Sequence, residues 1–212
     1  MNKDHPCCSN LGSPVIGIDE VGRGSLIGPV VTAAVLYHSA IPPGIRDSKK
    51  ICENKRNAFD EQIRQNAYVT IGEASVDEID KLGIYPATLL AMQRAGQALH
   101  RQIGANGGDL LFLIDGNAAP KLPARTITLI NGDNLCPTIA SASIVAKVYR
   151  DRLITTLAQH DQIYDWAKNK GYGVPKHLAA LERFGASPYH QCSFAPVKRA
   201  LEGIAKKGPP RP

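Results

Sequence analysis

Residues 15–37 read VIGIDEVGRGSLIGPVVTAAVLY, in which two hydrophobic segments flank a glycine-rich loop. Val15 to Asp19 and Pro29 to Tyr37 are rich in Val, Ile and Ala, which predicts two β-strands. The glycine spacing between them superficially suggests a dinucleotide-binding turn, but such a turn leads into a helix. Because a predicted strand follows instead, we expect this loop to bring backbone amides and carbonyls close to another kind of ligand.

Hydrophobic periodicity along the rest of the chain predicts alternating strands and helices. Ser75 and Glu78 have the capping-box spacing, which predicts a short helix that Gly83 ends. The further predicted strands are residues 68–74, 110–114 and 126–130, and the further predicted helices are residues 53–66, 85–103, 138–159, 175–184 and 196–206. This order predicts an α/β fold in which helices flank a mixed β-sheet, with a C-terminal helical extension from about residue 160.

The length of 212 residues fits one domain, at roughly 100 to 200 residues per domain. Residues 1–13 are polar with Pro and Gly, which predicts a disordered leader. Residues 206–212, KKGPPRP, predict a disordered basic tail. We therefore expect a single folded domain over residues 14–205.

Positive charge is concentrated in the last third of the chain. Residues 147–212 hold 12 Lys and Arg against 5 Asp and Glu, a net charge of +7, whereas the whole chain carries +6. Clustered positive charge gains free energy from counterion release when it binds phosphates, which favours nucleic acid as a partner. A solvated basic face with a basic tail is the alternative that charge alone leaves open.

The five cysteines form no CxxC pair and leave an odd thiol, which argues against a disulfide framework or a zinc site. The longest apolar runs are far shorter than the roughly 18 to 20 residues that a membrane span needs. The first residues lack the apolar stretch of a signal peptide. These features predict a cytoplasmic soluble protein with no membrane partner.

Four carboxylates lie at or just after the ends of predicted hydrophobic strands. They are Asp19, Glu20, Asp115 and Asp133. A charge there is costly unless it is paired or binds a metal, and ligands collect at the carboxyl edge of α/β sheets. Oxygen ligands without His or Cys suit a hard cation such as Mg²⁺ or Mn²⁺. Turn chemistry is the alternative for residues 115–117 (DGN) and 132–134 (GDN), because Asp, Gly and Asn favour turns.

Several basic and histidine side chains are further candidates. His177 and His190 could move protons, although two isolated histidines are more often structural. The candidates for phosphate contacts are Lys49, Lys147, Arg150, Lys170 and Lys176. For any one of them, a solvated surface position is the alternative interpretation.

One ordered series of motifs is more specific than these separate signals. Gly17-Ile18-Asp19-Glu20-Val21-Gly22-Arg23-Gly24 resembles the signature opening of the bacterial ribonuclease HII family, and the resemblance covers about residues 15–201. The motifs that continue it are Asp47-Ser48-Lys49-Lys50, Leu113-Ile114-Asp115-Gly116-Asn117, Gly132-Asp133, residues 140–151 (ASASIVAKVYRD), Lys170-Gly171-Tyr172-Gly173 and residues 193–199 (SFAPVKR).

The resemblance implies a ribonuclease H-like fold and an endoribonuclease that uses Mn²⁺ or Mg²⁺. The catalytic and metal-binding set that it implies is Asp19, Glu20, Asp115 and Asp133. The substrate-binding set is Gly22, Arg23, Gly24, Ser48, Lys49, Lys147 and Tyr172. Within this second set, the Gly-Arg-Gly loop is expected to contact the ribonucleotide, and Tyr172 to pack at the sugar and sense its 2′-OH.

The implied substrates are RNA/DNA hybrids and duplex DNA with single embedded ribonucleotides, which family members cut on the 5′ side of the ribonucleotide. We expect a monomer. The sequence departs from the family pattern at Ser25, where a proline is common, and at Val174, where a threonine is usual. It also has Gln191-Cys192 after His190, where an arginine is usual.

Two other functions are compatible with parts of this pattern. The first is another two-metal nuclease of the same fold, acting on DNA junctions or long hybrids. The second is a binding module in which the acids are structural and the basic last third grips nucleic acid. Cleavage that depends on a divalent metal and on one embedded ribonucleotide distinguishes the predicted enzyme from both.

Overall fold

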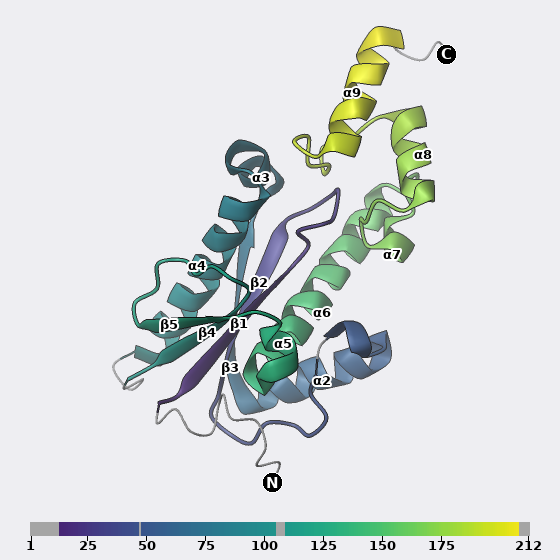
Figure 1. Cartoon of the computed structure of the whole chain (residues 1–212). Coiled ribbons are helices and arrows are strands. Elements are labelled where there is room, and N and C mark those ends of the chain that lie inside the picture. Colours follow the sequence, from purple (N-terminus) through teal and green to yellow (C-terminus); the bar gives the residue numbers. More distant parts are fainter. Residues whose placement is uncertain (1–12, 47, 105–108, 208–212) are drawn as a thin grey trace. The chain divides into compact units, whose positions relative to one another are not determined.

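The computed structural model describes residues 13–46, 48–104 and 109–207 (Figure 1). The expected leader and tail lie outside these residues, except for Ser13, Lys206 and Lys207. Contacts between residues divide the chain into two compact units, and the single folded domain stays a prediction. The first unit is Met1–Val21, Val31–Glu73 and Thr88–Tyr149, and the second is Gly22–Val30, Ala74–Ala87 and Arg150–Pro212.

A five-stranded mixed sheet forms the centre of the first unit (Figure 1). Its strands, in the order in which they lie side by side, are β3 (Ala67–Ala74), β2 (Val30–Tyr37), β1 (Val15–Val21), β4 (Leu111–Asp115) and β5 (Arg125–Leu129). β1 runs antiparallel to β2 and parallel to β4, and β4 runs parallel to β5. The mixed sheet confirms the predicted fold class.

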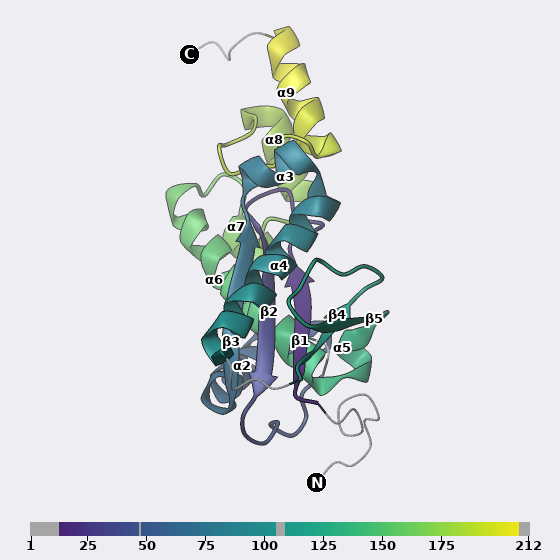
Figure 2. The ribbon, with the colours of Figure 1, turned by 90° about the vertical axis from the view of Figure 1, so that its left-hand side faces the viewer.

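Helices bury both faces of this sheet. The helical elements are η1 (Ser48–Lys50, a 3₁₀ helix), α2 (Glu53–Asn66), α5 (Gly132–Leu135) and parts of α4 (Ile84–Ile103) and α6 (Pro137–His160). Side chains alternate along a strand, so Ile16 and Phe112 pack with α4 on one face. Val31 and Leu111 face the opposite side, where α2 and α6 pack. Figure 2 shows α4 in front of the sheet.

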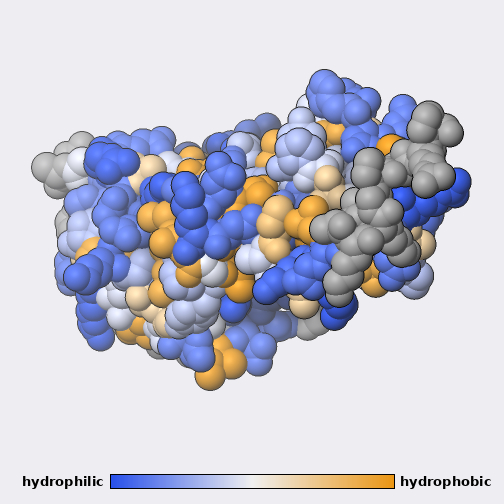
Figure 3. Space-filling model, turned by 90° about the horizontal axis from the view of Figure 1, so that it is seen from above, coloured by the Kyte–Doolittle hydropathy of each residue, from blue (hydrophilic) through white to orange (hydrophobic). Residues whose placement is uncertain are grey.

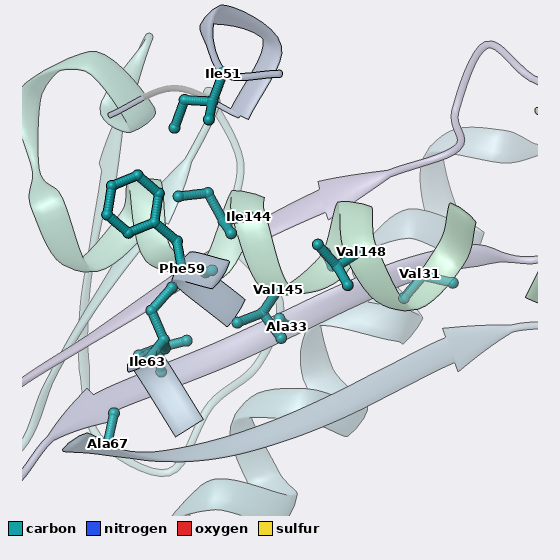
Figure 4. Packing of buried hydrophobic residues seen from close by; sticks show 12 residues of the cluster. Val31, Ala33, Ile51, Phe59, Ile63, Ala67, Ile144, Val145 and Val148 are labelled. Atoms are coloured by element: carbon teal, nitrogen blue, oxygen red, sulfur yellow. The ribbon is translucent and has the colours of Figure 1, made fainter. Parts of the chain in front are cut away.

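The helix α2 packs through Phe59 and Ile63, which lie four residues apart, as the sequence predicts. Both side chains point toward Ile144 and Val145 of α6 (Figure 4). Full burial of such a side chain stabilises the fold by roughly 1.5–3 kcal/mol. This cluster therefore anchors α6, the helix from which several candidate residues project, on the sheet.

Helices dominate the second unit. They are α3 (Val76–Leu82), α7 (Trp166–Asn169), α8 (Pro175–Phe184), α9 (Ala195–Lys207) and the end of α6. Their shared core includes Ile27, Ile154 and Trp166. The predicted capping box at Ser75 is present, and the C-terminal helical extension is confirmed. Periodicity does not predict α5 and α7, because four residues are too few to show a periodic pattern.

Among the described residues, no helix is long and apolar enough to cross a membrane. On the face shown in Figure 3, hydrophobic side chains are interspersed with hydrophilic ones. Exposed hydrophobic residues scattered in this way are ordinary for a folded protein. This surface therefore does not by itself indicate a site.

Candidate functional site

Asp19 of β1 and Asp115 of β4 are adjacent on one face of the sheet. The parallel register pairs Ile18 with Ile114, so Asp19 and Asp115 occupy the next positions along the two strands. Because side chains alternate, both carboxylates project to the face that packs against α6. Asp115 ends β4, as predicted, whereas Asp19 lies two residues before the end of β1.

The Asp19 carboxylate is buried, with 5% of the residue exposed. Its Oδ1 accepts a hydrogen bond from the backbone N–H of Glu20 at 2.7 Å, and the carboxylate is also hydrogen-bonded to Ser143. Burial raises the pKa of Asp19 well above its usual value, and the nearby Glu20 and Asp115 charges raise it further. A cation beside these carboxylates would favour their ionised form.

A short connection places Asp133 beyond β5. The backbone N–H of Gly132 donates to Asp115 Oδ1 at 2.6 Å. A Cβ atom at position 132 would lie 2.7 Å from Cδ1 of Ile139, so glycine permits this close approach. Asp133 is buried in α5, and its Oδ1 accepts a hydrogen bond from the Asn134 amide at 2.8 Å. Asp133 thus lies in a short helix and not, as predicted, at a strand end.

The four carboxylates all belong to the first unit. Among the described residues, no three His, Cys, Asp or Glu side chains form a group that could hold a metal ion as they stand. The chemistry of the set nevertheless fits a hard divalent cation, because all four donors are carboxylate oxygens. Turn geometry is also present, since Gly116, directly after the half-buried Asp115, has a φ of +104°.

Three of the predicted substrate contacts also lie in the first unit. Ser48 is buried, and its hydroxyl is 2.9 Å from that of Ser143, the residue that is hydrogen-bonded to Asp19. Lys49 is exposed, and Lys147 is half-buried on α6, one helical turn after Ser143. The structure therefore brings Ser48 close to the Asp19 region through Ser143, a residue that sequence reasoning had not singled out.

The Gly-Arg-Gly loop and Tyr172 come together in the second unit. Ser25 forms an antiparallel bridge with Tyr172. A Cβ atom at Gly24 would lie 4.0 Å from Cε1 of the tyrosine ring. Gly22 has a φ of +101°, and a Cβ atom there would lie 2.4 Å from Nε of Arg150, so this turn requires glycine. Arg23 is exposed, and Tyr172 is half-buried.

Arg150 holds these two segments together from a fully buried position. Its guanidinium donates to the carbonyls of Ile27 at 2.9 Å, Lys170 at 3.1 Å and Pro29 at 3.2 Å. It also lies 5.9 Å from the centroid of the Tyr172 ring. The prediction that Arg150 contacts phosphate is wrong, because its donors are turned to the protein's own carbonyls.

Two other predicted phosphate contacts have partners within the second unit. The Lys170 ammonium donates to the Thr155 hydroxyl at 3.0 Å. The Lys176 ammonium forms an exposed ion pair with Asp165 at 2.8 Å, which lowers the pKa of that aspartate. Exposed pairs of this kind are worth little and open readily. Phosphate binding by either lysine stays a prediction.

Comparison with known proteins identifies the family. The family model described as Ribonuclease HII matches residues 16–197. The chain belongs to the ribonuclease HII family. Ribonuclease HII from Rhizorhabdus wittichii is 48% identical over 185 residues, which cover 87% of this chain and 89% of that protein. Ribonuclease HII from Rhodospirillum rubrum is 45% identical over 204 residues, which cover 93% of this chain and 91% of that protein. The chain is therefore an endoribonuclease that cleaves RNA in RNA/DNA hybrids.

Solved structures confirm the ribonuclease H-like fold. Ribonuclease H2 from Pyrococcus horikoshii has a TM-score of 0.66 and 20% identity, and the match covers 91% of this chain and 99% of that one. Bst-RNase HIII in complex with Mn²⁺ has a TM-score of 0.69 and 17% identity, and the match covers 92% of this chain and 71% of that one. At this identity the likeness concerns the fold alone.

The departures from the ribonuclease HII pattern at Ser25, Val174 and Gln191 have visible structural consequences. The Ser25 hydroxyl lies 3.0 Å from the carbonyl oxygen of Gly171, next to Tyr172. Val174 is the N-cap residue of α8 and offers no side-chain acceptor for the helix. Gln191 is buried and donates to the carbonyl of Gly28 at 2.9 Å, while its own Oε1 has no partner within the described part of the chain.

Proposed function

We propose that this member of the ribonuclease HII family hydrolyses the RNA strand of RNA/DNA hybrids and also cuts 5′ of single ribonucleotides embedded in duplex DNA. The products would carry 3′-OH and 5′-phosphate ends. The observation that carries the proposal is the adjacency of Asp19 and Asp115 on one sheet face, where burial and the nearby charges of Glu20 and Asp115 raise the pKa of Asp19. The proposal includes a monomer that acts in the cytoplasm.

The four carboxylates are the proposed metal ligands. Asp19, Glu20, Asp115 and Asp133 would hold Mn²⁺ or Mg²⁺, since both ions prefer oxygen donors. Support comes from the Mn²⁺ complex of Bst-RNase HIII, which shares the fold. Two divalent ions held by carboxylates supply an activated water and stabilise the leaving oxygen in phosphodiester hydrolysis. The protein's own part is to keep Asp19, Glu20 and Asp115 on a rigid sheet and Asp133 in the short helix that follows β5.

The second unit supplies the proposed recognition of ribose. Backbone groups of Gly22, Arg23 and Gly24 would contact the ribonucleotide, because a 2′-OH is both a donor and an acceptor. Tyr172 would pack on the sugar, and its half-buried ring next to Gly24 supports this role. In the first unit, Ser48, Lys49 and Lys147 would contact the strands, with the lysines binding phosphates.

The experiment compares three matched duplexes: one with a single ribonucleotide, an RNA/DNA hybrid and an all-DNA control. Each is incubated with the protein in Mg²⁺, in Mn²⁺ or with a chelator, and the products are resolved at single-nucleotide length. We expect cleavage of the first two duplexes only, a cut 5′ of the ribonucleotide, and a 3′ end that a DNA polymerase extends.

The same experiment decides between the alternatives. Equal cleavage of the all-DNA duplex would indicate a nuclease that does not sense ribose. Binding without cleavage in either metal would indicate a binding module. A 3′ end that cannot be extended would contradict the proposed polarity of the cut.

A further inference from the structure

Two buried histidines of the second unit form a hydrogen-bonded pair next to Tyr172. The Nε2 atoms of His177 and His190 are 3.1 Å apart. The indole Nε1–H of Trp166 also donates to His177 Nε2, at 3.2 Å. On the other side of the ring, His177 Nδ1 lies 3.0 Å from the carbonyl oxygen of Tyr172. One imidazole thus connects the unit's core to the main chain of the proposed sugar-contacting residue.

The partners of His177 fix its tautomer. An indole N–H can only donate, so His177 Nε2 must be the bare, accepting nitrogen. A neutral imidazole carries its proton on the other nitrogen, so Nδ1–H donates to the Tyr172 carbonyl. The opposite tautomer would place two protons between His177 and Trp166 and two lone pairs between His177 and Tyr172.

The partners of His190 fix the tautomer of this second ring. The backbone N–H of Ser187 donates to His190 Nδ1 at 2.9 Å, so this nitrogen is bare. The proton of His190 therefore lies on Nε2 and points at His177 Nε2, which accepts it. Each proton along the series from Ser187 through His190 and His177 to Tyr172 then has one compatible place.

We propose that His177 and His190 are positioning residues that hold Tyr172 through its main-chain carbonyl, by a hydrogen-bond chain that requires both rings to be neutral. The consequence for substrate recognition rests on the proposed function of Tyr172. Two local hydrogen bonds also restrain this residue: its N–H donates to the Asn169 carbonyl, and its carbonyl accepts from the Val174 N–H. The imidazole adds a contact between this turn and the core, next to those that Arg150 makes with Lys170 and Ser25 makes with Gly171.

The surroundings of the pair favour neutral rings. Burial lowers the pKa of His177, and burial together with the His177 ring lowers the pKa of His190 to about 4. The other rings against the pair are those of Tyr164 and Trp166, whose centroids lie 4.8 and 5.5 Å from that of His190. Tyr164, whose hydroxyl donates to the Gly185 carbonyl, is a titratable group that faces both histidines, and burial raises its pKa.

Two conservative variants of His177 distinguish its proposed role in positioning Tyr172 from a purely structural role in the core. In His177→Gln, the amide reaches the place of Nε2 and can accept from Trp166 and His190, but the donor to Tyr172 is lost. In His177→Asn, the shorter amide reaches the place of Nδ1 and keeps that donor, but Trp166 and His190 lose their acceptor. A buried donor without an acceptor destabilises a protein, so Asn should be the less stable variant.

The readouts are steady-state cleavage of the single-ribonucleotide duplex and the midpoint of thermal unfolding, both on the full chain. A displacement of about 1 Å can cost roughly 10²-fold in rate, so we expect His177→Gln to lose at least tenfold more activity than His177→Asn. Activity and stability then rank the variants in opposite orders. Activity losses that follow the stability losses would overturn the proposal.

A spectroscopic test is independent of catalysis. Nitrogen chemical shifts of the imidazole rings at neutral pH should show His177 protonated on Nδ1 and His190 protonated on Nε2. Trp166 is the single tryptophan of the chain, and its fluorescence should be quenched by a histidinium only when the pH falls well below 6.5. The opposite tautomers, or quenching with an ordinary histidine midpoint, would overturn the hydrogen-bond chain.

The proposed function of Tyr172 and the positioning role of the two histidines can be contradicted by different results. If the unmodified protein leaves the single-ribonucleotide duplex intact, the proposed function of Tyr172 is overturned, whereas the tautomers still decide the hydrogen-bond chain. If the protein cuts that duplex but the two His177 variants lose activity equally at equal stability, the positioning role alone is overturned.

Discussion

The carboxylate of Asp115 disfavours ionisation of Asp19 from the neighbouring parallel strand of the same sheet. Burial is the largest cause and acts in the same direction, as does the charge of Glu20, so the folded protein holds the pKa of Asp19 above its unfolded value. A carboxyl group of this kind adds stability when it is protonated at low pH, and this contribution is lost as the pH rises through its folded-state pKa. The ionised form of Asp19 therefore lowers the stability of the metal-free protein, and a bound cation would offset this cost.

Asp19→Asn should accordingly separate activity from stability. We expect cleavage to be abolished, because the proposed metal site loses a charge. The midpoint of thermal unfolding of the metal-free protein should rise, by about 2–4 °C if the gain is of the order of 1 kcal/mol. Glu61→Gln, which changes an exposed carboxylate of α2, is the control that should change neither quantity. Normal turnover by Asp19→Asn in Mg²⁺ would remove Asp19 from the site.

Arg150→Lys should act on stability and not on phosphate binding. A single ammonium cannot reach the three carbonyls that the guanidinium satisfies, and unsatisfied buried groups cost about 1–3 kcal/mol each. We expect a loss of roughly 2–4 kcal/mol by denaturant unfolding. Arg152→Lys, an exposed position two residues later, should have little effect. An unchanged stability of Arg150→Lys together with weaker nucleic-acid binding would restore the phosphate role.

Lys49 and Lys147 are the predicted phosphate contacts whose role salt dependence can test. Each lysine that neutralises a phosphate adds about 0.9 to the slope of log affinity against log salt. Changing either lysine to alanine should lower the magnitude of this slope by about that amount for hybrid and all-DNA duplexes alike. Lys81→Ala, an exposed change in α3, is the control. A slope that stays constant in the Lys49 and Lys147 variants would argue for a solvated surface role.

Val174→Thr should stabilise the protein. Val174 has the extended backbone of an N-cap residue but no acceptor for the first N–H groups of α8. A threonine hydroxyl at an N-cap is worth about 1 kcal/mol. Thermal unfolding should therefore shift upward by a few degrees, whereas Val174→Ala, which adds no acceptor, should give no gain. Identical midpoints for the threonine and alanine variants would show that α8 does not use this cap.

Local sequence patterns predicted most of the fold because they depend on neighbours within a few residues. The capping box at Ser75 and the four-residue spacing of Phe59 and Ile63 are examples. The position of Asp19 and Asp115 on hydrophobic strands could likewise be predicted from the residues that precede each of them. Their adjacency could not, because it depends on the parallel register between β1 and β4, which the sequence of a single strand does not specify.

Local sequence patterns could not predict the roles of Arg150 and the histidine pair, because these roles arise from contacts between residues that are distant in sequence. Arg150 bonds to carbonyls more than 100 residues away. A signal was nevertheless present: Ala146 and Ile154 lie four residues before and after Arg150, so the arginine falls in the buried stripe of α6. His177 and His190, 13 residues apart, meet only because the segment after α8 returns to the start of that helix.

Tyr172 provides the sharpest test of ribose recognition, because its main chain holds the turn whereas its side chain is the group proposed to contact the sugar. The turn is held by hydrogen bonds of its backbone, so Tyr172→Ala should cost little stability. If the ring packs on the sugar, Tyr172→Ala should lower cleavage of the single-ribonucleotide duplex by roughly 10²-fold, since misplacement by about 1 Å has that effect. Tyr172→Phe keeps the ring and loses the hydroxyl, so it should fall between. Steady-state cleavage and a melting curve are measured for each variant. Parallel losses of activity and stability would mean that Tyr172 is structural, and full activity of Tyr172→Ala would exclude it from the site.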